Sequence, residues 1–158
     1  MSRLLSAVGF RARISPDSIA VSSPSRTYTY AELAVQVDRT ADRLGSLQRL
    51  FRPGAPVAVM LENGPAWVIL DLALMQLGWP SLPIPGFFTA EQREHALADS
   101  GAGLLLSSEH GLRSFDVAET RMLATPLRVP AVALPPGTAK ITYTSGSTGR
   151  PKGVCLSQ

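Results

Sequence analysis

Two consecutive apolar segments constrain the fold of this 158-residue chain more than any other feature. Residues 56–61 have the sequence PVAVML, a continuous apolar run without the alternation of a half-exposed strand. Such a run is typical of a strand that is covered on both faces, as in a parallel sheet. Residues 67–77 are apolar nearly all round, which predicts a helix enclosed between other layers. Together the two segments predict an α/β fold, layered, with a largely parallel sheet and packed helices.

Local start and stop signals delimit the other elements. Thr29 and Glu32 have the spacing of a capping box, and Thr89 and Gln92 repeat it, so a helix is expected to begin at each site. Helix ends are expected at the glycines Gly45, Gly78 and Gly101, and a helix start at Asn63-Gly64-Pro65. Short strands are expected over residues 19–21 and 27–29, as a hairpin, and over residues 104–106, 139–144 and 154–157.

Two regions carry weaker signals. Residues 107–138 contain four prolines, so we expect a loop-rich excursion there with at most short strands. The arginine-containing N-terminus superficially suits a transit peptide, but a short surface helix is the better interpretation.

Composition argues against several classes of function. The chain has 15 basic and 12 acidic residues, a net charge of +3, without a basic run, so no nucleic-acid partner is expected. The single Cys155 excludes an internal disulfide framework, and two histidines argue against a zinc site. No apolar stretch approaches the ~20 residues that cross a bilayer, so we expect no membrane span and a cytoplasmic location.

Several chemically capable side chains have ordinary structural interpretations. Trp67 and Trp79 are expected in the core, and His95 on a solvated helix surface. Cys155 is expected to be a small buried residue on a strand. The acidic side chains on the helix of His95 are interpreted as a solvated face rather than a metal cluster: Glu91, Glu94 and Asp99.

The segment between the last two predicted strands carries the chemistry. Residues 143–153 have the sequence YTSGSTGRPKG. Glycines allow the backbone to approach an anion closely, and successive N–H groups can form an anion-binding concavity. Ser145, Ser147 and Thr148 add hydroxyl donors, and Lys152 adds a mobile positive charge. A Walker A loop, a dinucleotide-binding glycine pattern and a nucleophile elbow all fail on spacing.

This segment resembles the phosphate-binding signature of the adenylate-forming (AMP-dependent) synthetase and ligase superfamily. That superfamily contains acyl- and aryl-CoA synthetases, adenylation domains of nonribosomal peptide synthetases and firefly luciferase. Two weaker similarities lie upstream, at residues 29–33 (TYAEL) and in the turn after residues 56–61, although Ala66 stands where an acid is usual.

The resemblance implies that a carboxylate attacks the α-phosphate of ATP, and that a thiol of CoA or of a carrier protein then takes the acyl group. It implies that Thr144 contacts Mg²⁺ and that Lys152, in a supporting role, neutralises charge on the leaving phosphates. The residues that it implies wrap the β- and γ-phosphates are Ser145, Gly146, Ser147, Thr148 and Gly149.

The resemblance also implies that residues 1–158 are an N-terminal fragment of an AMP-binding domain, the N-terminal portion of the large domain. The rest of that domain and a small C-terminal domain would be absent, so the fragment alone is expected to be inactive. Two alternatives remain: a stand-alone nucleotide- or anion-binding module, or a non-catalytic fragment that self-associates through the edge strand at residues 154–157.

Overall fold

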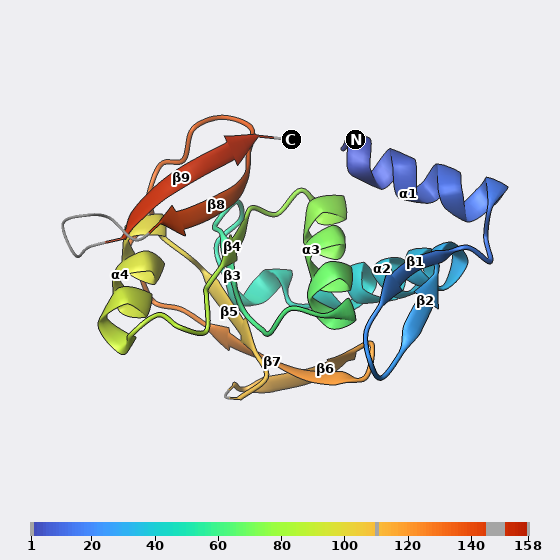
Figure 1. The fold of residues 1–158 in the computed structure, drawn as a ribbon. Helices are drawn as coiled ribbons and strands as arrows, with labels where there is room; N and C mark the ends of the chain where they lie inside the picture. The colour runs from blue at the N-terminus through green and yellow to red at the C-terminus, as the bar shows by residue number, and fades with distance from the viewer. Residues whose placement is uncertain (1, 110, 145–150, 158) are drawn as a thin grey trace.

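The computed structural model describes residues 2–109, 111–144 and 151–157, and a seven-stranded sheet organises them (Figure 1). The strand order is β6-β7-β5-β3-β4-β8-β9. The central strands run parallel to one another. They are β3 (Val57–Met60), β4 (Ser81–Pro83), β5 (Leu104–Ser107) and β8 (Thr138–Thr144). The predicted α/β fold is therefore confirmed at its centre, where each strand has a neighbour on both sides.

The edges of the sheet are antiparallel. Strands β6 (Arg113–Val117) and β7 (Thr120–Pro126) form a hairpin that pairs with β5 through β7. The expectation of at most short strands over residues 107–138 is therefore wrong, because β7 spans 7 residues and includes Pro126. Proline lacks an N–H donor, but it is tolerated at the end of a strand. At the other edge, β9 (Lys152–Ser157) pairs with β8.

Helices cover both faces of the sheet (Figure 1). Helices α2 (Tyr30–Gly45) and α3 (Pro65–Leu77) share one core with β3, β5 and β7. Helix α4 (Ala90–Ser100) lies on the opposite face and shares a second core with β4 and β8. Strand β3 alternates between the two cores, with Val57 and Val59 in the first and Ala58 in the second. This double coverage explains why residues 56–61 are apolar without alternation.

Local capping explains where these helices begin and end. Thr29 caps α2 and Thr89 caps α4, each in a complete capping box with Glu32 or Gln92. Gly101 ends α4 in the left-handed conformation, with φ of 66°, which favours glycine. Both capping predictions are confirmed, as are the ends of α2 at Gly45 and of α3 before Gly78.

The N-terminal region lies outside the main layers. Helix α1 (Arg3–Ile14) has no buried residue, which confirms the predicted surface helix. Strands β1 (Ile19–Ser22) and β2 (Thr27–Thr29) form the predicted hairpin, and a short 3-10 helix covers Gln48–Leu50. Of the helices in the described part of the chain, none combines the length and apolar character that a membrane crossing requires.

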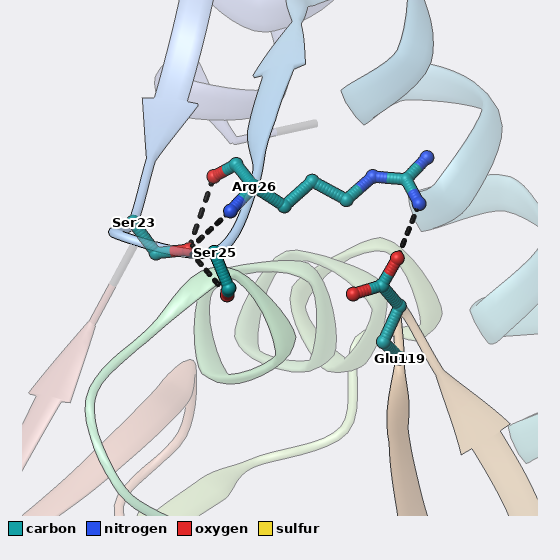
Figure 2. A network of polar contacts seen from close by, with 4 residues as sticks. All are labelled: Ser23, Ser25, Arg26 and Glu119. Atoms are coloured by element: carbon teal, nitrogen blue, oxygen red, sulfur yellow. Dashed lines mark hydrogen bonds and ion pairs between the residues drawn. The ribbon is translucent and has the colours of Figure 1, made fainter.

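A polar network connects the β1–β2 hairpin to the β6–β7 turn (Figure 2). The Arg26 guanidinium donates to the Glu119 carboxylate at 2.5 Å and lies over the Tyr28 ring, 4.8 Å from its centroid. The Ser23 hydroxyl donates to the Arg26 carbonyl and accepts from its N–H. The network thus joins two hairpins that are distant in sequence, although both charged side chains are exposed.

Candidate functional site

The candidate phosphate site lies at the base of the β8–β9 hairpin. Thr144 ends β8 and Lys152 begins β9, and the two residues are direct partners in the antiparallel ladder. Directly opposed residues of an antiparallel pair project from the same face of a sheet. The structure therefore brings together two of the residues that the sequence analysis predicts to bind phosphate and Mg²⁺. The other selected residues lie outside the described part of the chain: Ser145, Gly146, Ser147, Thr148 and Gly149.

Strand β9 begins two residues earlier than the sequence predicts. The predicted strand over residues 139–144 is confirmed by β8, which ends at Thr144, but β9 starts at Lys152 and not at Val154. Backbone pairing accounts for the difference, since Tyr143 faces Gly153 in the ladder as Thr144 faces Lys152. The side chains of Thr144 and Lys152 are thus positioned by regular strands.

The site lies at the side of the sheet where the four parallel strands have their carboxyl ends. Strands β3, β4, β5 and β8 have the same direction, so their carboxyl ends meet there. Ligands of open α/β sheets bind in the crevice outside these carboxyl ends. Thr144 and Lys152 are both exposed, and within residues 2–109, 111–144 and 151–157 Lys152 forms no ion pair. Its charge is available to an anionic ligand.

Lys140, the other lysine of the chain, is already engaged. Its ammonium group donates to the Asp71 carboxylate at 2.7 Å and lies 5.2 Å from the centroid of the Trp67 ring. Ser81 donates to the second Asp71 oxygen at 3.1 Å. These contacts fasten β4 and β8 to α3, so Lys140 has a structural role in the sheet.

Helix α4 contacts β8 next to Thr144. The Tyr143 hydroxyl donates to the Asp99 carboxylate at 2.6 Å, which is the short distance of a charge-assisted hydrogen bond. Burial of the ring, followed by this hydrogen bond to Asp99, raises the pKa of the Tyr143 phenol far above its ordinary value. The interpretation of Asp99 as part of a purely solvated face is thus incomplete.

The same helix contacts the residue before Lys152. A ring nitrogen of His95, Nε2, lies 3.1 Å from the Pro151 carbonyl oxygen. The carbonyl can only accept, so Nε2 carries the hydrogen and donates. The His95 ring also meets the Tyr143 ring edge to face, with centroids 6.4 Å apart. The expected solvated position of His95 is therefore incomplete, because the side chain is half-buried and has a partner 56 residues away that the polar pattern of α4 could not reveal.

Three other side chains show which positions a sequence pattern can predict and which it cannot. Cys155 is exposed rather than buried, as are the other five residues of β9. Trp67 and Trp79 do pack against the first core, as expected. The described residues include no group of three or more His, Cys, Asp or Glu side chains that could hold a metal ion.

A known protein family matches nearly the whole chain. The family model described as AMP-binding enzyme matches residues 10–158, which include both Thr144 and Lys152. The chain belongs to the AMP-binding enzyme family.

Relatives of this AMP-binding chain include two enzymes whose names specify the acid that is joined to CoA. A feruloyl-CoA synthase from Amycolatopsis sp is 38% identical over 156 residues, which are 92% of this chain and 31% of that enzyme. A 2-succinylbenzoate–CoA ligase from Bacillus subtilis is 32% identical over 153 residues, 91% of this chain and 31% of that enzyme. The AMP-binding chain thus spans about a third of the length of these relatives.

Solved structures share its fold. The o-succinylbenzoate CoA synthetase from Bacillus subtilis, in complex with AMP, superposes with a TM-score of 0.72 at 30% identity. The match covers 95% of this chain and 41% of the synthetase chain. The N-terminal subdomain of Klebsiella oxytoca NpsA, in complex with 3-hydroxybenzoyl-AMSN, gives a TM-score of 0.75 at 26% identity. That match covers 99% of this chain and 41% of the NpsA chain. The fold of this AMP-binding chain is therefore that of part of an adenylate-forming enzyme.

Proposed function

We propose that residues 1–158 are the N-terminal part of an AMP-binding domain in an AMP-forming carboxylate ligase. The observation that carries the proposal is the pairing of Thr144 with Lys152 at the carboxyl edge of the parallel sheet, within the segment YTSGSTGRPKG. The substrates are ATP and a small-molecule carboxylate, and the acceptor is the thiol of CoA or of a carrier protein. The relatives that act with CoA support the thiol acceptor.

The chain's own residues bind the part of ATP that leaves. Lys152 is exposed and forms no ion pair among the described residues, so its ammonium group can stabilise the negative charge that develops on departing pyrophosphate. The exposed Thr144 hydroxyl lies on the same face and offers an oxygen ligand of the kind that Mg²⁺ takes. Mg²⁺, when bound there, would neutralise phosphate charge. The remaining phosphate contacts are assigned to Ser145, Gly146, Ser147, Thr148 and Gly149.

The fragment alone is proposed to bind phosphates without completing adenylation. A titration of the ¹⁵N-labelled chain with Mg-ATP and with Mg-pyrophosphate tests this, with Lys152→Ala as the binding-deficient variant. Saturable shifts at Thr144 and Lys152 that weaken in Lys152→Ala are expected. A folded chain that responds to neither ligand would show that the segment does not hold phosphates.

The activity of the whole ligase requires a separate test in the full-length protein. Carboxylate-dependent exchange between ATP and labelled pyrophosphate is expected, and it should fall in Lys152→Ala. Exchange that does not depend on any carboxylate would contradict the ligase assignment. Binding by the fragment without exchange in the full-length protein would favour the stand-alone anion-binding module.

Strand β9 supports a second role in self-association. Its six residues are all exposed, and among the described strands only β8 pairs with it. Val154 and Leu156 are 46% and 43% exposed, and an unpaired strand edge recruits other strands. Sedimentation velocity should show concentration-dependent dimers that Val154→Lys abolishes. A chain that stays monomeric at every concentration would contradict this role.

We also propose a cytoplasmic location. Fractionation of the source cells, with detection of the protein by antibody, is expected to place it in the cytoplasmic fraction.

A further inference from the structure

Helix α4 contacts both ends of the connection between β8 and β9. Asp99 accepts the hydrogen bond from Tyr143, the residue before Thr144, at 2.6 Å. His95 donates to the carbonyl of Pro151, the residue before Lys152, at 3.1 Å. Positions four apart lie on the same face of a helix, so one face of α4 makes both contacts.

The geometry of α4 is itself fixed at both ends. A complete capping box at Thr89 begins the helix, and Gly101 ends it. Ala96 is fully buried in the second core, which also contains Ile141 and Tyr143 of β8. His95 and Asp99 therefore extend from a rigid support and not from a mobile loop.

Strand β9 is held by its pairing with β8 and by this contact from α4. All six of its residues are exposed, and its ladder partner is β8 alone. Pro151, by contrast, is buried, and its carbonyl faces His95. The contact from α4 thus holds the chain at the point where it enters β9, one residue before Lys152.

We infer that His95, Asp99 and Tyr143 are positioning residues of the phosphate site, through which α4 holds Thr144 and Lys152 in place for a polyphosphate. The inference rests on the proposed function. None of the three needs to touch the ligand, because Tyr143 faces the α4 core while its neighbour Thr144 projects from the opposite face of the strand. A preorganised site binds more tightly because less ordering remains to be done on binding.

The test is the affinity of the chain for Mg-pyrophosphate, measured by calorimetry under conditions where every variant is folded. His95→Ala and Tyr143→Phe are each expected to weaken binding by about tenfold, the effect of about one hydrogen bond. His95→Gln keeps a donor and Asp99→Asn keeps an acceptor, so both should bind nearly as tightly as the unchanged chain. Glu94→Ala, at an exposed position on the same helix, is the matched control.

The comparison separates positioning from simple stabilisation. If these residues only stabilise the fold, substituting them lowers the free energy of unfolding but leaves the affinity for Mg-pyrophosphate unchanged as long as the protein is folded. Equal affinities in all of these variants would overturn the inference and leave the proposed function intact. If the unchanged chain does not bind Mg-pyrophosphate, the proposed phosphate-binding function is contradicted, and the positioning role that rests on it is contradicted as well.

Discussion

The ring of Tyr143 fills the space that a side chain at position 153 would occupy. The two residues are partners in the β8–β9 ladder, and a Cβ added to Gly153 would lie 2.9 Å from Tyr143 Cζ and 3.0 Å from its hydroxyl oxygen. The ring cannot turn aside without losing its hydrogen bond to Asp99. Glycine at position 153 is therefore required by close packing, since both residues belong to regular strands.

Gly153→Ala is expected to destabilise the chain by about 1–3 kcal/mol, because overpacking displaces the Tyr143 ring. Urea unfolding measures this free energy. Gly9→Ala is the control, since a Cβ there meets nothing within 4 Å and Gly9 lies in a helix, where alanine is favoured. Equal stabilities of Gly153→Ala and the unchanged chain would show that the hairpin adjusts without loss.

Breaking the ion pair between Lys140 and Asp71 is expected to destabilise the sheet. The two side chains are only 24% and 14% exposed, so Lys140→Met leaves a largely buried carboxylate with Ser81 as its remaining partner. The expected loss in unfolding free energy is about 1–3 kcal/mol.

The matched variant is Lys140→Met combined with Asp71→Leu. It is expected to recover much of the loss, because an apolar pair needs no compensation for buried charge. A double-mutant cycle by urea unfolding gives the coupling energy between the two side chains. A coupling energy of zero would contradict the assignment of a structural ion pair.

Tyr143 should make stability depend on alkaline pH. Burial, then the hydrogen bond to Asp99, raises its pKa in the folded chain, whereas the unfolded chain ionises near its ordinary value of ~10. The contribution to stability is therefore complete below pH ~10 and is lost as pH rises further, because only the unfolded chain releases the proton. Tyr143→Phe should be less stable at neutral pH but lose less on alkalinisation, as measured by urea unfolding across this range. Parallel pH profiles for the two proteins would contradict the shift.

Cys155 is expected to react with a thiol reagent in the folded chain. It is exposed on β9, a strand whose six residues are all exposed. Labelling by a chromogenic disulfide should be complete and as fast without urea as with it. Protection in the folded state that disappears on dilution would indicate that β9 is covered by a second copy.

The sequence determined the elements whose causes lie within a few residues. Capping boxes at Thr29 and Thr89 satisfy helix N–H groups locally, and Gly101 supplies a left-handed helix end locally, so these boundaries were predictable. The apolar run over residues 56–61 likewise reports burial on both faces of a strand. The segment YTSGSTGRPKG was enough to indicate the family and the candidate residues, because it resembles a known phosphate-binding signature over eleven contiguous positions.

Only the tertiary structure decided which distant segments meet. Strand β7 joined the sheet despite its proline because β5 offered an open edge to pair with. His95 found its acceptor at Pro151, and Lys140 found Asp71, across separations of 56 and 69 residues. Cys155 was left exposed together with the rest of β9, the last strand at its edge of the sheet. Such contacts depend on how packed layers are arranged, and local periodicity contains no information about that arrangement.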